Sequence, residues 1–293
     1  MPEPLIARDL PFPEVLWKLP SNVHLRRGKV LLIGGFPGHL KGTLEIAEVC
    51  GVLQVRDIII VLPEGVARAL PSIPDIEIVA APETPSGTLA NEALPTIQKS
   101  AGGSDCVLLG PDLSKQPETL QLAKELVRTT EAPLIISGDV LEAVLAADFS
   151  ARKRPTALVT DMGGLARLLK QSGFSGHGQR NLLEFLYKDY QRLLPEVGRD
   201  WKVALTITTP EAVIAGSDAR LAFVPELAVD RLAQHIPTLL GLFLSLGSLH
   251  PDSLFECSVD ALVVLRELIK KTASADRQTL MRELPKVVTS LAS

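Results

Sequence analysis

Short runs of consecutive apolar residues alternate with amphipathic segments along most of the chain. The apolar runs occupy residues 29–35, 57–63, 76–82, 106–110, 133–138 and 156–161. They are continuously apolar and do not alternate with polar positions, which is typical of strands buried on both faces. We therefore predict an α/β fold, with a mostly parallel central sheet and helices on both of its faces.

Helical patterns lie between these runs. The predicted helices span residues 43–53, 117–128, 139–147 and 164–170. In the second of them, Leu120, Ala123 and Leu126 fall on one face, and Pro117 and Glu118 stand where a helix start favours them.

The last third of the chain has a different pattern. Residues 202–208 and 212–216 are separated by a short polar link, which predicts an antiparallel hairpin at the sheet edge. From Ala228 onward the pattern is helical only. Because no linker or change of composition appears, we expect a single domain over residues 1–293. Its extended N-terminal arm would span residues 1–25 and its C-terminal helices residues 228–293.

Composition narrows the possible partners. The chain of 293 residues is 46% hydrophobic and 22% charged, and its formal net charge is −4. These values favour a sizeable core and argue against duplex nucleic acid or an anionic membrane as a partner. The densest basic cluster, Arg152 to Arg154, is expected to be a solvated loop. The longest apolar stretch, residues 237–249, is too short for a membrane span, which needs about 20 residues.

The cysteines and the N-terminus bear on localisation. Cys50, Cys106 and Cys257 are far apart, and no Cys/His cluster with the spacing of a zinc site exists. Three scattered cysteines suit a reducing compartment, and the N-terminal residues lack the basic and apolar regions of a signal peptide. We expect a cytoplasmic protein without a metal site.

The stretch VLLIGGFPGHLKGT has the order strand, glycine-rich turn, helix that many proteins use to hold phosphate. In the P-loop pattern G-x-x-x-x-G-K-[ST], Gly35 and Lys41 fit. Leu40, however, replaces the second glycine, and Gly42 replaces the hydroxyl residue. The dinucleotide fingerprint G-x-G-x-x-G also fails, because Gly34 and Gly35 are adjacent. We expect a tight turn that borders a crevice and does not grip a nucleoside triphosphate.

Two further candidates for chemistry are weak. GFSGH, residues 173–177, resembles the G-x-S-x-G nucleophile elbow, but His177 replaces the last glycine and no strand precedes it. Of the five histidines, His39 in the glycine loop is the one most suited to touch a ligand. A solvated loop histidine is the alternative.

Four predicted strands end in motifs that follow one another in a definite order, namely IGGFPG, LLGPDLSK, IISGDVLEAVL and LVTDMGGLARLL. This series, from about His24 to about Gly247, resembles the ribokinase-like NAD(P)H-hydrate dehydratase family, whose members are also described as carbohydrate kinases. The resemblance implies a three-layer ribokinase-like fold with a ligand crevice at the carboxyl ends of the strands. The crevice residues that it implies are Gly34, Gly35, Gly38, His39, Gly110, Pro111, Asp112, Asp139, Asp161, Met162 and Gly164.

The resemblance also implies a small nucleotide-like ligand and a homo-oligomer. ADP or ATP with Mg²⁺, and NAD(P)H, are the family's cofactors and substrates. The residues themselves leave the cofactor of this chain open.

The chain departs from the family where phosphate is handled. Asp112 replaces a glycine of the family's GPGLG signature, and Thr206 replaces the lysine of its VLKG strand end. The family's GGTGD turn forms an anion hole and supplies the catalytic aspartate. The residues at its GTGD positions are Gln234, His235, Ile236 and Pro237. Proline offers neither a carboxylate nor an N–H group, and it stands at the position of the aspartate.

Three hypotheses follow. The first is a catalytically degenerate member of the family, a pseudoenzyme that keeps the crevice. The second is an active ADP- or ATP-dependent dehydratase or small-molecule kinase in which Asp112, Asp139 or Asp161 has taken over as base. The third is a purely structural oligomerising module. For each aspartate a helix cap is the alternative role, and Asp139 suits an N-cap best.

Overall fold

One ten-stranded sheet runs through the part of the chain that the computed structural model describes. The described residues are 5–6, 12, 14–16, 24, 26–144, 146–173, 182–208, 212–217, 220–225, 227, 234–272 and 276–292. Among them the strand order is β1-β10-β9-β8-β7-β6-β5-β2-β3-β4. The strands are β1 (Leu5–Ile6), β2 (Arg27–Ile33), β3 (Val55–Pro63), β4 (Ile76–Ala81), β5 (Cys106–Leu109), β6 (Leu134–Ser137), β7 (Thr156–Asp161), β8 (Ala204–Thr208), β9 (Ala212–Ser217) and β10 (Arg220–Pro225).

Seven strands that are neighbours in the sheet, in the order β4-β3-β2-β5-β6-β7-β8, run parallel to one another. They include all six apolar runs of the sequence, so the prediction of a mostly parallel sheet is confirmed. On β2, Val30 and Leu32 face one core cluster, and Leu31 and Ile33 face the other. All four side chains are buried, which is why the run shows no polar alternation.

The predicted hairpin of β8 and β9 is confirmed, but its position at the sheet edge is wrong. Leu205 lies opposite Gly216 in an antiparallel ladder. β10 then pairs with the outer side of β9, and β1 pairs with β10 in parallel. The sequence analysis missed β10 because this short segment begins with an arginine and ends with a proline. Pairing with β10 satisfies the backbone groups that β9 would otherwise expose.

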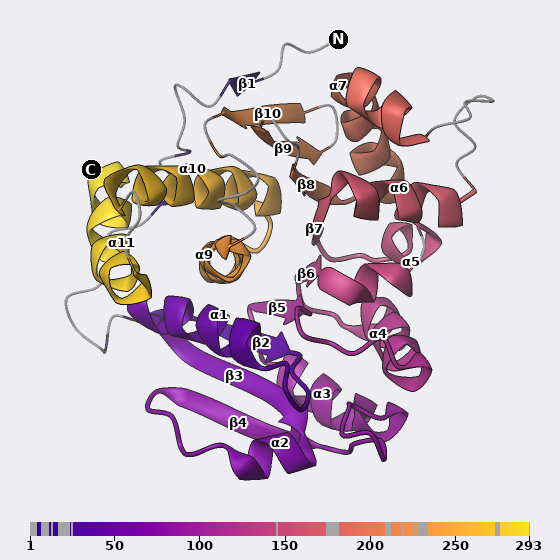
Figure 1. Cartoon of the computed structure of the whole chain (residues 1–293), viewed down its shortest axis with the longest axis vertical. Coiled ribbons are helices and arrows are strands. Elements are labelled where there is room, and N and C mark those ends of the chain that lie inside the picture. The colour runs from indigo at the N-terminus through magenta and orange to yellow at the C-terminus, as the bar shows by residue number, and fades with distance from the viewer. Residues whose placement is uncertain are drawn as a thin grey trace.

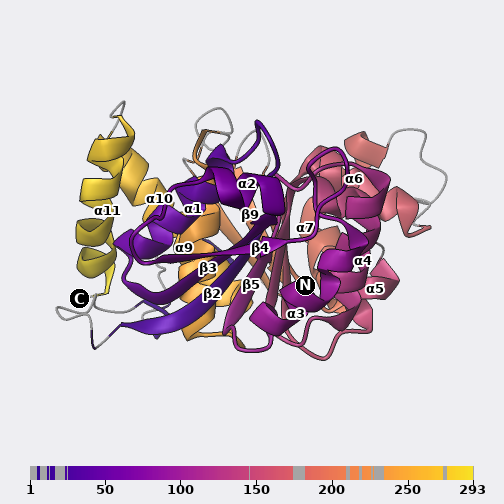
Figure 2. The same ribbon diagram turned by 90° about the horizontal axis from the view of Figure 1, so that it is seen from below.

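Helices cover both faces of the sheet (Figure 1). One layer contains α1 (Lys41–Val52), α9 (Ile236–Leu249), α10 (Leu254–Thr272) and α11 (Arg277–Leu291). The other contains α3 (Leu94–Ala101), α4 (Pro117–Thr129), α5 (Ala146–Ser150), α6 (Met162–Gln171) and α7 (Leu182–Trp201). The short helix α2 (Glu64–Ala69) lies beside β4, at the sheet edge that faces the viewer in Figure 2. The three-layer α/β fold is therefore as predicted.

The predicted helix over residues 139–147 is wrong. A 3₁₀ helix, η3 (Gly138–Glu142), follows β6, and α5 begins only afterwards. The chain leaves the sheet at Gly138 with φ +71°, and the position of a Cβ on that glycine is 3.5 Å from Pro111 Cα. Tighter i→i+3 winding accommodates so close an exit, and Ala143 N–H donates to Val140 O in this way.

Candidate functional site

The sheet order brings the carboxyl ends of β2 and β5 side by side. From β2 the chain proceeds outward to β3 and β4, whereas β5, β6, β7 and β8 follow on the other side of β2. Such a reversal creates a crevice outside the carboxyl ends of the strands, and ligands of open α/β sheets bind there. Most of the predicted crevice residues lie in the loops that leave these strands.

The loops after β2 and β5 are in direct contact. A Cβ on Gly34 would lie only 2.3 Å from Pro111 O, so glycine is required there. Gly35 has φ +101°, and its N–H donates to Asp112 O over 2.7 Å. The paired glycines therefore let two loops close on each other, which accounts for the tight turn expected from the sequence.

The rest of the glycine loop folds back on itself. Phe36 and His39 exchange two backbone hydrogen bonds, with Pro37 and Gly38 at the centre of the turn. Gly38 has φ +80°, as the third position of a type II turn requires. The His39 ring is exposed and stacks on Phe36, with ring centroids 4.4 Å apart. His39 thus lies on an exposed turn that continues directly from the Gly34–Gly35 turn, and it has Phe36 as an aromatic partner.

Asp112 acts as a helix cap for a helix that lies far away in the sequence. It adopts φ +60°, which is uncommon for residues other than glycine. Its Oδ2 accepts a hydrogen bond of 3.1 Å from Thr43 N–H in the first turn of α1. Leu40, the residue at the N-cap of α1, makes no side-chain cap bond. The carboxylate of Asp112 supplies the cap that the local sequence lacks.

Asp161 also caps a helix. Its Oδ1 accepts a hydrogen bond of 2.6 Å from Gly164 N–H and so caps α6. Met162 is buried at the start of that helix. A Cβ on Gly164 would lie 2.0 Å from Thr160 Oγ1, which excludes any larger residue without rearrangement.

The N-cap role predicted for Asp139 is wrong. The cap residue of η3 is Ser137, and Asp139 lies inside the helix. The position of the Asp139 side chain lies outside the described residues, as do residues 174–177 of the serine motif.

The segment that the sequence resemblance aligned with a glycine-rich turn lies at the start of α9. His235 is the N-cap residue without a side-chain cap bond, and Pro237 stands in the first turn. Ile236 and Pro237 are half-buried, whereas Gln234 is exposed. Burial lowers the pKa of His235 and the charge of Arg277 lowers it further, while Glu45 opposes the change. A histidine whose neutral form is favoured and a proline therefore occupy this helix start.

Thr206 is buried within the sheet. It lies on β8 between Val159 of β7 and Ala215 of β9. Its side chain is buried, and its Oγ1 makes no hydrogen bond to the described residues. A buried hydroxyl therefore occupies the strand position that the sequence resemblance aligned with a lysine.

Within the ranges given above, the structure contains no group of three His, Cys, Asp or Glu side chains that could hold a metal ion. In the same part of the chain, no helix is both long and apolar enough to cross a membrane.

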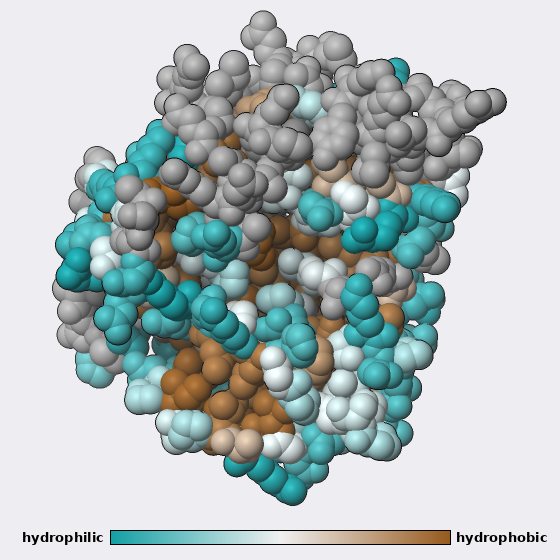
Figure 3. Space-filling model, viewed as in Figure 1, coloured by the Kyte–Doolittle hydropathy of each residue, from teal (hydrophilic) through white to brown (hydrophobic). Residues whose placement is uncertain are grey.

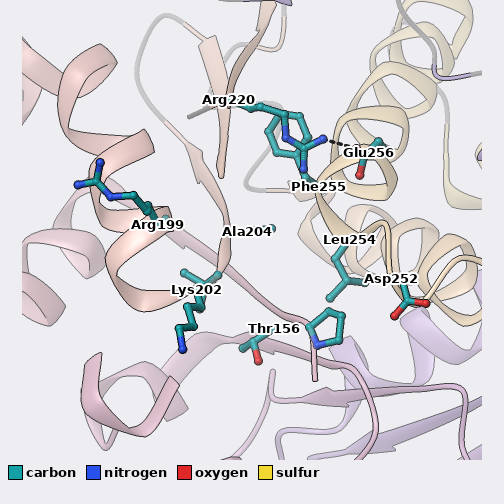
Figure 4. A pocket seen from close by; sticks show the side chains of 12 residues that line it. Thr156, Arg199, Lys202, Ala204, Arg220, Asp252, Leu254, Phe255 and Glu256 are labelled. Carbon is teal, nitrogen blue, oxygen red and sulfur yellow. Dashed lines mark hydrogen bonds and ion pairs between the residues drawn. The ribbon is translucent and has the colours of Figure 1, made fainter. Parts of the chain in front are cut away.

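A cavity of about 270 Å³ lies at the amino ends of the strands, on the opposite side of the sheet from the loops described above (Figure 4). Thr156 and Ala204, at the amino ends of β7 and β8, form part of its wall. Arg220 points toward Glu256, with which it forms an ion pair, and its guanidinium carbon is 4.3 Å from the ring centroid of Phe255. The sequence analysis singled out none of these residues, because their chain positions are far apart.

An apolar groove of about 330 Å³ follows β4 and α2. Its lining includes Leu70, Ile73, Ile76 and Ile78. Figure 3 shows brown, hydrophobic side chains gathered over this part of the surface. β4 is the last strand of the sheet, so its outer backbone groups are unpaired by the described strands.

Comparison with known proteins gives a consistent picture. No family model matches the chain. The bifunctional NAD(P)H-hydrate repair enzyme Nnr of Moorella thermoacetica is 28% identical over 203 residues, which cover 68% of this chain and 36% of that enzyme. The enzyme of the same name from Thermofilum pendens is 40% identical over 101 residues, 34% of this chain and 19% of that enzyme. The chain thus spans little more than a third of the curated relatives at most.

Solved structures show the same fold. The ADP/ATP-dependent NAD(P)H-hydrate dehydratase from Bacillus subtilis, co-crystallised with ATP and Mg²⁺, matches with a TM-score of 0.68 and 17% identity. The match covers 97% of this chain and all of that one. A ribokinase-like superfamily protein from Enterococcus faecalis matches with a TM-score of 0.66 and 16% identity, over 95% of this chain and 93% of that one.

Proposed function

We propose that the chain is a catalytically degenerate member of the ribokinase-like NAD(P)H-hydrate dehydratase family and that it binds a small nucleotide-like molecule. The proposed ligand site is the crevice at the carboxyl ends of β2, β5, β6 and β7. The contact of Gly34 with Pro111 supports a preserved crevice, because the two loops still close on each other.

The residues at the start of α9 are the main support for the proposed loss of catalysis. In the family this helix start provides an anion hole and an aspartate base. Here Pro237 provides neither a carboxylate nor an N–H, and half-buried Ile236 fills space that glycine would leave open. Removing one oxyanion-hole donor typically costs 10²–10³ in rate. The loss of donors and base together leaves little chemistry at this position.

The two described alternatives for a base also have structural roles. Asp112 and Asp161 each accept a backbone N–H at a helix start. Each carboxylate is therefore already engaged in a helix cap, which accounts for its presence without a catalytic role. This favours the degenerate reading over an active dehydratase or kinase.

The proposal includes two further properties. We propose a homo-oligomer, as the family resemblance implies, with the apolar groove along β4 as the supporting observation. We also place the chain in the cytoplasm, because all three cysteines are free and buried, as suits a reducing compartment.

Binding and turnover test the proposed function separately. Thermal-shift measurements with ADP, ATP and Mg²⁺, NADH, NADPH and adenosine should show stabilisation by at least one of them. A ligand at 100 times its Kd adds about 2.7 kcal/mol to the free energy of unfolding. Recovery of NADH from its hydrate, with ADP or ATP present, should stay at the background rate. Pro237→Asp should not restore turnover, since the glycines of the turn are also missing.

Turnover above background that Asp112→Ala or Asp139→Ala abolishes would show an active enzyme instead. A chain that no probe stabilises would support the structural module.

A further inference from the structure

We propose that Asp112 determines the ligand specificity of the crevice by excluding phosphate from the start of α1. The ligand would then present an uncharged or cationic part, such as a nucleoside base or ribose, to this side of the crevice. The inference rests on the proposed ligand crevice and specifies the chemical class that it accepts.

The start of α1 is built as an anion site. Its first-turn N–H groups point out of the helix and carry partial positive charge. Gly42 stands in this turn, and the position of a Cβ there is 2.8 Å from Asp112 Oδ2. Glycine thus lets a negatively charged group approach the backbone closely.

The protein fills this anion site with its own carboxylate. Asp112 Oδ2 accepts from Thr43 N–H at 3.1 Å, and the left-handed backbone of Asp112 directs the side chain there. The neighbouring N–H of Gly35 binds Asp112 O, which fixes the loop. A phosphate group would have to displace this carboxylate or lie beside it.

A second observation indicates that the site is made for a polar occupant. Thr43 is 2% exposed, and its Oγ1 has no hydrogen-bond partner among the described residues. This hydroxyl is 3.6 Å from the position of a Cβ on Gly34, so it lies between the helix start and the glycine turn. A buried hydroxyl without a partner is costly, and it is therefore a group that a ligand oxygen or nitrogen would satisfy.

Electrostatic repulsion by Asp112 is expected to weaken the binding of a phosphate group at this helix start. Like charges a few ångströms apart at a partly buried site repel by enough to change affinity at least about tenfold. Exposed Lys41 in the first turn forms an ion pair of 3.9 Å with Glu45. Asp112 Oδ2 instead accepts directly from Thr43 N–H, so its carboxylate is a charge in contact with this helix start.

The test compares phosphate affinity in three forms of the chain by ³¹P NMR titration with inorganic pyrophosphate. Asp112→Asn keeps an oxygen acceptor for Thr43 N–H and tolerates the left-handed backbone, while it removes the charge. We expect it to bind pyrophosphate at least about tenfold more tightly than the wild type. Asp112→Gly, which relieves the backbone conformation, should show the same gain if the asparagine variant folds poorly.

Asp276→Asn is the matched control, because it removes the same charge from a capping aspartate on a different helix, α11, which is not part of the proposed crevice. Its pyrophosphate affinity should equal that of the wild type. Equal affinity in the wild type and both Asp112 variants would overturn the inference, and so would the absence of binding in all of them. An equal gain in the control would also overturn it, since net charge would then be the cause.

The proposed function has a separate test, whose outcome does not depend on this result. It fails if neither adenosine nor any nucleotide stabilises the wild type, whereas the inference depends only on the change that Asp112 variants cause with pyrophosphate.

Discussion

At the residue scale, several carboxylates of this protein have structural roles that the neighbouring sequence does not predict. Asp112 and Asp161 cap helices at the crevice. Asp260 is fully buried in α10, where its Oδ1 accepts a 2.8 Å hydrogen bond from Phe12 N–H in the N-terminal segment. Its Oδ2 has no partner among the described residues. A buried carboxylate with one free oxygen is costly to ionise.

Asp260 should make the stability of the protein depend on pH. Burial raises the pKa of Asp260 from 3.8 to about 7; the N–H of Phe12 partly opposes this, and Glu14 and Glu256 add to it. The folded state therefore holds a proton that the unfolded state releases, so the free energy of unfolding falls as the pH rises from 3.8 to about 7. Asp260→Asn should remove this decrease in the free energy of unfolding, which is on the order of a few kcal/mol between pH 3.8 and about 7.

Urea unfolding of both forms at pH 5 and pH 8 measures this effect. The difference between the two forms isolates Asp260 from the other titrating groups. The same pH dependence in both would show that Asp260 does not titrate in this range.

At the element scale, the contact between α1 and α9 holds the helix layer against the sheet. Gly241 of α9 makes this contact possible, because a Cβ there would be 2.6 Å from Val49 Cβ and 3.1 Å from Ile46 O. The sequence resemblance aligned Gly241 with a glycine of the family's GGTGDVLAG segment, and the structure gives this glycine a role in helix packing.

Gly241→Ala should destabilise the protein by about 1–3 kcal/mol, because the two helices must move apart. Gly51→Ala in α1 is the matched control. A Cβ there would meet only Ile58 Cδ1, at 3.9 Å, so the change should be neutral or stabilising by up to about 1 kcal/mol. Chemical denaturation at one pH measures both. Equal effects would show that the helices adjust freely.

At the scale of the whole molecule, the sheet has one edge that its own described strands leave open. β4 ends the sheet, and the side chains of its own residues Ile76 and Ile78 are only partly buried. Exposed strand edges with apolar neighbours are prone to pair with other chains. The proposed crevice at the carboxyl ends of the strands and the cavity of Figure 4 at their amino ends both lie away from this edge strand.

We expect light scattering after gel filtration to give a mass at least twice the 31.5 kDa of one chain. Ile78→Glu, which puts a charge in the groove, should lower that mass. Glu77→Lys, on the opposite face of β4, should leave it unchanged. A wild-type mass equal to one chain would contradict the proposed homo-oligomer.

The sequence by itself determined the fold class and the main strands. Runs such as residues 29–35 and 57–63 are apolar throughout because both sheet faces are covered, and that signal is local. The start of α4 was also readable, since Pro117 and Glu118 favour a helix start wherever they occur. The order of the strand-end motifs was enough to indicate the family.

Only the tertiary structure decided how the individual site residues are used. Asp112 and Thr43 are 69 positions apart, and Phe12 and Asp260 are 248 apart. These pairs meet because the sheet order places β5 beside β2 and packs α10 against the N-terminal segment. β10 was missed for a local reason, since this short segment begins with an arginine and ends with a proline. The local pattern of apolar and polar residues shows which positions are buried. Whether a residue caps a helix, carries a buried charge or determines specificity depends on which distant backbone group lies within about 3 Å.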